Sequence, residues 1–179
     1  MIWFLKIIID LAFMFLALTL SPVVALFVDK NWMLPHGLSW FQTQDSRMNG
    51  QWGDWRFGQK YIKYAGTKLG RWYTAVRWQW RNTGQGFSQK VMGFDVHPAA
   101  TITLRGTRSF GGETSENGWY FARAANPDGK SAWQLYVTYH YKKLPGYLFR
   151  LNFGWKLWGI RAHRCQIVCA ITPFKKLQA

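Results

Sequence analysis

The chain has 179 residues and a formal net charge of +15 at pH 7. This length fits one compact domain with an anchor, since domains commonly run from about 50 to 250 residues. Two cysteines exclude a disulfide-rich scaffold. The 12 tryptophans are more than a small interior absorbs, so we expect some of them at an interface.

The first 28 residues are apolar except for Lys6 and Asp10. Leu11 to Val28 gives 18 uncharged positions, and Ile7 to Ile9 lengthens the stretch enough to cross a bilayer as a helix. A cleaved signal peptide and a buried core helix are the alternatives, but Asp10 interrupts the apolar region and the segment is long for a signal peptide. We predict a transmembrane anchor at residues 1–28.

The positive charge lies almost entirely beyond this anchor. After residue 28 the chain holds 22 of its 23 Lys and Arg residues and 7 of its 8 acids, so the whole excess of 15 lies there. Such a field attracts anionic lipid headgroups, nucleic acid or an acidic partner. Lys6 on one side of the anchor nearly balances Lys30 and Arg47 on the other. Free thiols and the anionic inner leaflet favour a cytoplasmic position for the basic region.

Residues 29–55 contain many tryptophan, glycine and polar residues, which is typical of a connector that lies along a membrane. We predict that Trp32, Trp40 and Phe41 form an aromatic belt at the membrane interface while Lys30 reaches the phosphates. The alternative is a loop whose aromatic side chains cap the core of the domain that follows.

Residues 56–179 are predicted to form a basic α+β domain, which begins with an amphipathic helix over 56–82. Spacings of three and four place on one stripe Ile62, Ala65, Leu69, Trp72, Val76 and Trp80. The cations expected mostly on the other side, predicted to bind anions, are Lys60, Lys63, Lys68, Arg71 and Arg81. Such a helix can lie in the plane of an anionic membrane. The alternative is a surface helix whose charges are merely solvated.

From residue 94 the hydrophobic period changes to two, which predicts an antiparallel β-meander. The expected strands are 101–108, 118–124, 131–142 and 147–158, with a last strand near 165–172 that ends at Pro173. The alternation predicts that the buried side of the sheet carries Leu135, Val137, Phe149, Leu151 and Phe153.

No catalytic residue and no metal or cofactor site is predicted. Glu113, Glu116 and Asp128 lie in a loop and a turn, so a carboxylate pair for a hydrolase has little support. His163, Cys165 and Cys169 lack a fourth metal ligand. In an extended strand the two cysteines stand about 13 Å apart, too far for a disulfide.

Six segments carry a resemblance over nearly the whole chain: "LSPVVALF", "WFQTQD", "VRWQWRNTGQGF", "GWYFAR", "NFGWKLWG" and "TPF". In this order they resemble a family of small uncharacterised membrane-anchored proteins encoded by tailed bacteriophages and prophages. Gln44 and Thr83 replace prolines of the family pattern. The resemblance implies a viral origin and supplies no mechanism.

These observations together predict a phage-encoded, single-pass protein of the host inner membrane that acts as a non-enzymatic accessory or interaction factor at the envelope. Superinfection exclusion, host modulation and lysis assistance all fit. The expected partners are anionic membrane lipid and a host or phage membrane protein. The alternative is a membrane-tethered nucleic-acid-binding protein, because "RWYTAVRWQWR" at 71–81 interleaves cations with rings that can stack on bases. A phage hydrolase is the third reading.

Overall fold

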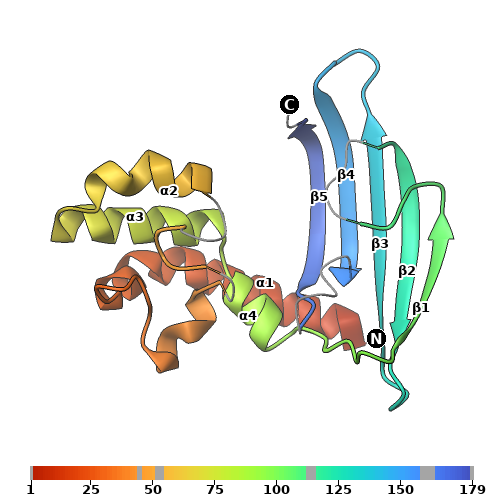
Figure 1. Cartoon of the computed structure of the whole chain (residues 1–179), viewed down its shortest axis with the longest axis horizontal. Helices are drawn as coiled ribbons and strands as arrows, with labels where there is room; N and C mark the ends of the chain where they lie inside the picture. Colours follow the sequence, from red (N-terminus) through yellow and green to blue (C-terminus); the bar gives the residue numbers. More distant parts are fainter. Residues whose placement is uncertain (1, 44–45, 51–54, 112–115, 158–163, 178–179) are drawn as a thin grey trace. The chain divides into compact units, whose positions relative to one another are not determined.

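The computed structural model describes residues 2–43, 46–50, 55–111, 116–157 and 164–177 (Figure 1). The chain divides into two compact units, Met1–Met92 and Gly93–Ala179. The first unit is helical and the second contains a five-stranded antiparallel sheet. The predicted α+β class is therefore confirmed. The predicted connector and basic helix belong to the same unit as the apolar N-terminal helix.

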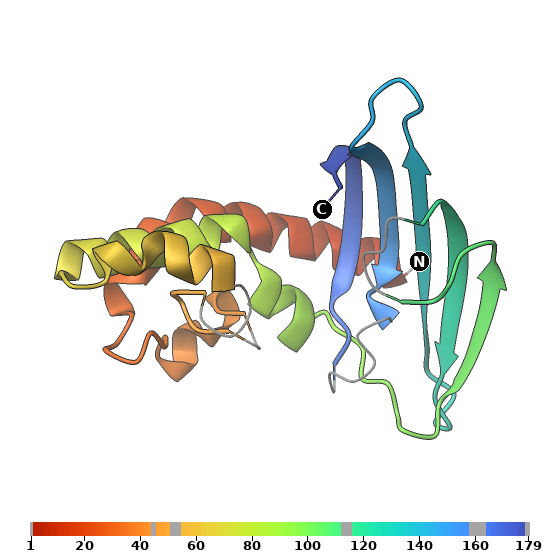
Figure 2. The same ribbon diagram turned by 45° about the horizontal axis from the view of Figure 1, so that its top comes forward.

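The helical unit contains two longer helices and several short ones. In chain order these are α1 (Ile2–Val24), η1 (Ala25–Phe27), η2 (His36–Phe41), α2 (Trp55–Tyr61), η3 (Ile62–Tyr64), α3 (Lys68–Arg81) and α4 (Gln85–Lys90). α1 and α3 lie side by side in both views of the molecule (Figures 1 and 2).

α1 continues through Pro22 to Val24. Proline has no backbone N–H, so the carbonyl oxygen of Leu18 loses its usual helical donor. Two side chains replace that donor: Ser21 Oγ lies 2.9 Å and Trp80 Nε1 3.2 Å from the Leu18 oxygen. These bonds explain how an internal proline is accommodated near the end of α1.

The predicted helix over 56–82 is interrupted between η3 and α3. Thr67 caps α3, because its Oγ1 accepts a hydrogen bond from the Gly70 backbone N–H at 3.0 Å. Gly70 is required here, since a Cβ would lie 1.7 Å from the Tyr64 carbonyl oxygen. The chain therefore forms two separate helical segments instead of one long helix.

This interruption makes the prediction of one continuous apolar stripe wrong. Residues before and after the break do not continue one helical period, and in α3 Leu69 is 73% exposed and Trp80 is 44% exposed. Val76 is buried as expected, but it shares the interior with Trp78 and Gln79.

The core of the helical unit is a cluster of buried residues from several elements: Val24, Ala25, Leu34, Met48, Phe57, Tyr61, Ala75, Val76 and Trp78. Gln42 of the "WFQTQD" segment fixes the connector beside it. Its Oε1 accepts from the Leu34 backbone N–H at 2.9 Å, and its Nε2 donates to the Ser46 carbonyl at 3.2 Å. Gln42 is buried, so these bonds offset its desolvation. Gln44 and Asp45 lie outside the described residues.

The sheet is an antiparallel meander in which sequential strands are neighbours. Its strands are β1 (Thr101–Gly106), β2 (Gly118–Ala125), β3 (Ser131–His140), β4 (Tyr147–Trp155) and β5 (Ile167–Lys176). All five correspond to predicted strands, and Figure 1 shows them side by side from β1 to β5.

β5 is longer than predicted, because Pro173 does not end it. The pairing with β4 shifts register between Leu148 and Arg150 and resumes at Leu148 with Lys175. β5 is an edge strand, and Pro173 lies at this irregularity, where proline needs to donate no ladder hydrogen bond.

The buried side of the sheet is opposite to the predicted one. The residues expected in the core, including Leu135, Val137 and Phe149, are only partly buried. The fully buried side chains come from the alternate positions: Tyr120, Ala122, Ala124, Gln134, Tyr136 and Asn152. The prediction assumed that polar side chains are exposed to solvent. This assumption fails when buried polar groups form hydrogen bonds with one another.

Two hydrogen bonds and an arginine explain this inverted core. Gln134 Nε2 donates to Asn152 Oδ1 at 2.9 Å, and Gln134 Oε1 accepts from the Leu157 backbone N–H at 3.0 Å. Arg108 lies over the Tyr136 ring, 4.6 Å from its centroid, and donates to Thr138 Oγ1 at 3.2 Å. The segment after β1 thus covers this side of the sheet.

Candidate membrane-binding surface

α1 presents a continuous set of exposed apolar side chains. Together with η1 it forms the one helical stretch of the described chain that is long and apolar enough to cross a membrane, Ile2–Phe27. The exposed residues are Ile2, Phe4, Leu5, Ile8, Ile9, Leu11, Phe15, Leu16, Leu18, Leu20, Val23, Leu26 and Phe27. The 23 residues of α1 measure about 35 Å at 1.5 Å per residue, which exceeds the ~30 Å hydrocarbon core.

The C-terminal half of α1 is held by two indole hydrogen bonds from α3. Trp72 Nε1 donates to the Pro22 carbonyl at 2.7 Å, and Trp80 Nε1 donates to the Leu18 carbonyl at 3.2 Å. From Trp72 to Trp80 along α3, the bonded residue of α1 moves back from Pro22 to Leu18, so the two helices are antiparallel. The Pro22 carbonyl lies in the last turn of α1, where helical donors are missing. The Leu18 carbonyl has lost its helical donor because Pro22 has no N–H.

The N-terminal half of α1 is accompanied by α4. Phe87 stacks on Phe13 with ring centroids 4.1 Å apart, and Ser88 Oγ donates to Asp10 Oδ1 at 2.7 Å. Asp10 and Ser88 are both buried. Gly84 permits this approach at the turn before α4, since its φ is +69° and a Cβ would lie 2.7 Å from Met14 Cγ.

α1 therefore has two different sides. One side is covered along much of its length by α3 and α4, while the other is apolar and exposed. Lys6 belongs to the covered side, because its Nζ donates to the Met92 carbonyl at 3.4 Å. Lys6 and Asp10, the two charged residues of the apolar segment, each form a hydrogen bond with a group of the same helical unit.

The four residues predicted at the membrane interface separate into two pairs. Trp32 and Phe41 pack against the core cluster of the helical unit, as the capping alternative expected. Lys30 is exposed and Trp40 is 50% exposed, with its ring edge-on to Phe87. Trp40 and Lys30 thus remain accessible to a membrane, whereas Trp32 and Phe41 also have a structural role.

The predicted anion-binding residues lie around aromatic rings. Lys60 Nζ is 5.6 Å from the Tyr61 ring centroid and Lys63 Nζ is 5.0 Å from that of Tyr64. These contacts lie within the range of cation–π attraction. Both cations are exposed, so they are available to anions.

The remaining predicted cations lie on α3. Lys68 is exposed and Arg71 is half-buried in its first turn, while Arg81 lies in its last turn, 5.7 Å from the Phe57 centroid. Lys60 lies on α2 and Lys63 on η3, whereas the other three cations lie on α3, so the five cations do not lie on one continuous helix as predicted.

Arg77 was not predicted as a site residue, although it contacts the same group of tyrosines as Lys60 and Lys63. Its Nε donates to the Tyr61 hydroxyl at 3.3 Å, and Tyr61, Tyr64 and Tyr73 form a cluster with centroids 5.6–6.2 Å apart. In the sequence, Tyr73 and Arg77 are four residues apart, about one helical turn, and this spacing indicates that the two side chains lie on the same face of a helix.

The groups considered for chemistry are engaged in local contacts. Asp128 pairs with Lys130 at 2.9 Å, and Glu116 accepts hydrogen bonds from Ser109. Among the described residues no cluster of His, Cys, Asp and Glu could hold a metal ion. Glu113 and His163 lie outside the described residues.

No disulfide joins Cys165 and Cys169. Cys165 is buried, and this burial raises the pKa of its thiol to about 11. Cys169 is exposed on β5.

A family model described as a family of unknown function (DUF7338) matches residues 1–179. The chain belongs to DUF7338. Comparisons with curated proteins and with solved structures give no match. Membership of DUF7338 therefore assigns no reaction or partner, and the exposed side of α1 carries the functional argument.

Proposed function

We propose that this DUF7338 protein is a phage-encoded, non-enzymatic accessory protein that acts at the host envelope and associates with the inner membrane through α1. The single observation that carries the proposal is the exposed apolar side of α1. Contiguous apolar surface of this extent on a soluble protein marks a membrane or protein interaction site. The net charge of +15 favours an anionic lipid surface as the partner.

The packing of α1 supports an in-plane position over the predicted single pass. α3 and α4, which accompany α1, carry Arg77, Arg81 and Lys90. If the packed unit crossed the bilayer, these cations would enter or border the hydrocarbon at a cost of about 2.5–3.5 kcal/mol for each one at its centre. An in-plane α1 buries its exposed side in lipid while α3 and α4 face the aqueous phase.

The test of membrane attachment is a pair of matched triple variants in the full chain. Phe4→Ser, Leu11→Ser and Phe15→Ser change exposed positions of α1, while Leu104→Ser, Ile171→Ser and Phe174→Ser change exposed positions of the sheet. The α1 variant should move from the membrane pellet to the soluble fraction after a carbonate wash. The sheet variant should stay with the membrane. Equal retention of both variants would refute attachment through α1.

Cysteine labelling distinguishes the two topologies. Ile2→Cys and Asn31→Cys introduce thiols at exposed positions near the two opposite ends of α1. The background carries Cys165→Ala and Cys169→Ala. An in-plane helix leaves both thiols on one side of the membrane, so a membrane-impermeant maleimide should modify both or neither in intact spheroplasts. Modification of one position alone would establish a single pass and overturn the in-plane arrangement.

The same membranes test the role at the envelope. For each of the proposed roles, superinfection exclusion, host modulation and lysis assistance, we expect a host or phage membrane protein as partner. Affinity purification of the full chain after crosslinking should recover such a protein, and the α1 triple variant should lose it. Expression in the host should also change plaque formation or lysis timing. Unchanged infection and lysis in cells that retain the protein in the membrane would refute the accessory role.

A further inference from the structure

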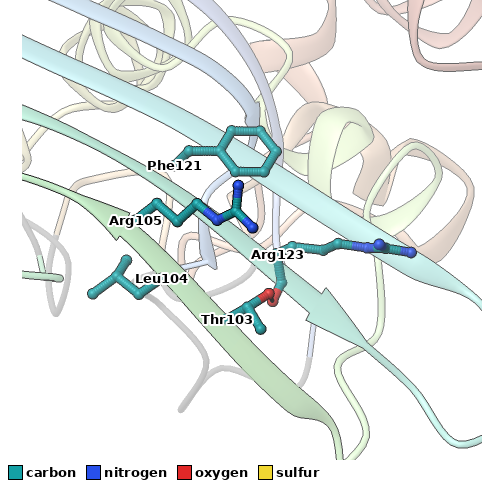
Figure 3. A pocket seen from close by; sticks show the side chains of 5 residues that line it. All are labelled: Thr103, Leu104, Arg105, Phe121 and Arg123. Atoms are coloured by element: carbon teal, nitrogen blue, oxygen red, sulfur yellow. Dashed lines mark hydrogen bonds between the residues drawn. The ribbon is translucent and has the colours of Figure 1, made fainter.

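A hollow of about 460 Å³ lies on the sheet at β1 and β2 (Figure 3). It is lined by Thr103, Leu104, Arg105, Phe121 and Arg123. Figure 3 shows the Arg105 side chain extending beside the Phe121 ring, while Leu104 points away from them. The volume lies within the usual range for ligand sites, about 300–1,000 Å³.

The strand register places four of these side chains on one face. Arg105 is paired directly with Phe121, and Thr103 directly with Arg123. Positions two apart on a strand share a face, so both arginines flank the aromatic ring. The ladder fixes the face on which these residues lie, whichever rotamer each arginine adopts.

Part of the lining of the hollow is aromatic. Phe121 is 36% exposed, and its ring stacks on that of Trp133 of β3 with centroids 6.1 Å apart and an interplanar angle of 19°. Trp119, two positions before Phe121 on the same face, is also exposed. A planar ligand can therefore stack on a ring that is itself supported from the side.

The surroundings are positive. The five strands contain no Asp or Glu. Of the acids in this unit that the structure describes, Asp95 pairs with Arg164 and Asp128 with Lys130, while Glu116 binds Ser109. Across the described part of the chain, Arg105 and Arg123 have no carboxylate partner.

We propose that this basic and aromatic hollow, called the groove below, binds single-stranded nucleic acid. A base would stack on Phe121, and Arg105 and Arg123 would hold the backbone phosphates. Arginine presents a planar fork of donors that fits phosphate oxygens in pairs. Aromatic side chains on an open sheet face are a general means of stacking unpaired bases. The Thr103 hydroxyl donates to the Arg123 backbone carbonyl at 3.4 Å, which holds the two strands together at this site.

Two other occupants fit less well. A lipid surface is flat and prefers protruding apolar side chains, whereas Phe121 lines a hollow together with two arginines. An acidic peptide would use the two arginines but would gain nothing from the stacked rings of Phe121 and Trp133. Arg123 Nη2 donates to Ser131 Oγ at 3.4 Å, but within the described residues neither arginine has a carboxylate partner. The combination of two such guanidinium groups with a supported ring favours a nucleotide chain.

The test is fluorescence anisotropy of the full chain in neutral detergent with a labelled mixed-sequence single-stranded oligonucleotide. Phe121→Leu keeps an apolar side chain and removes the ring, so affinity should fall about 5- to 150-fold, the loss expected for one stacked base. Arg105→Gln with Arg123→Gln should reduce the salt slope of log K by about 0.7 for each lost phosphate contact. The matched control is Lys142→Gln with Lys143→Gln, which removes equal charge from an exposed turn.

The control variant should bind nearly as tightly as wild type, and duplex DNA should compete poorly. Equal losses in the control and the arginine variant, with Phe121→Leu unchanged, would show non-specific charge attraction and overturn the proposal. Binding to phosphatidylglycerol vesicles, or to a polyglutamate peptide, that depends on Arg105 and Arg123 while oligonucleotide binding does not would assign the groove to that partner instead. Membrane retention of the α1 variants is measured separately, so the two proposals fail independently.

Discussion

The indole N–H of Trp80 donates to the carbonyl oxygen of Leu18 at 3.2 Å, the same carbonyl that Pro22 deprives of its helical donor. A residue of α3 thus completes the backbone hydrogen bonding of α1 across 62 positions of sequence. Ser21 Oγ supplies a second donor at 2.9 Å. The proline and the tryptophan are therefore coupled features of one interface.

Replacement of Trp80 by phenylalanine tests this coupling. Trp80→Phe keeps the ring and removes the N–H, so the free energy of unfolding in neutral detergent should fall by about 1 kcal/mol. Pro22→Ala restores the helical N–H, and in that background Trp80→Phe should cost less. A double-mutant cycle from urea unfolding measures the difference. Identical costs in both backgrounds would show that the indole bond does not serve the freed carbonyl.

A second prediction concerns the packing of α4 on α1. Asp10→Cys with Ser88→Cys replaces a pair joined by a 2.7 Å hydrogen bond, so mild oxidation should form a disulfide between them. The background carries Cys165→Ala and Cys169→Ala. The control is Leu11→Cys with Ser88→Cys, because Leu11 points to the exposed side of α1. The first pair should crosslink in membranes as well as in detergent, as measured by non-reducing gel mobility after proteolysis between α1 and α4.

Crosslinking in detergent but not in membranes would mean that lipid separates α1 from α4. The in-plane arrangement would then lose its support, since the cations of α3 and α4 would no longer accompany the helix.

The strands were predictable because an alternating pattern is local. Two-residue periodicity and turn residues located β1 to β5 to within a few residues, and the meander followed from the short connections. The buried face was not predictable by polarity, because Gln134 and Asn152 satisfy each other in the interior. The strand register pairs Gln134 with Gly154 and Asn152 with Tyr136, so the two amides meet as diagonal neighbours, which no local pattern predicts.

The helical unit shows a different limit. Apolar spacing continued through the interruption before Thr67, so periodicity did not reveal that η3 and α3 are separate. The length and hydropathy of α1 were evident from the sequence, but its partners were not. The contacts of Asp10 with Ser88 and of Pro22 with Trp72 span 78 and 50 positions, and no local pattern encodes them.

The inverted core gives a third prediction. Gln134→Ala leaves the Asn152 side chain and the Leu157 N–H without this partner, at a cost of about 1–3 kcal/mol for each buried group. Leu135→Ala, on the half-exposed face, should cost clearly less. Urea unfolding of the full chain, followed by tryptophan fluorescence, compares the two. A larger loss for Leu135→Ala would restore the face that polarity predicts.

The two cysteines provide the last prediction, which depends on pH. Burial raises the pKa of the Cys165 thiol to about 11, so at pH 8 this group is almost entirely the unreactive neutral thiol. Cys169 is exposed, and iodoacetamide should modify it first. Cys165 should react at an appreciable rate only as the pH approaches 11 or once urea unfolds the sheet. Mass spectrometry of Cys165→Ala and Cys169→Ala variants assigns each rate. Equal alkylation of both thiols at pH 8 in the folded protein would contradict the buried position of Cys165 beside Phe94.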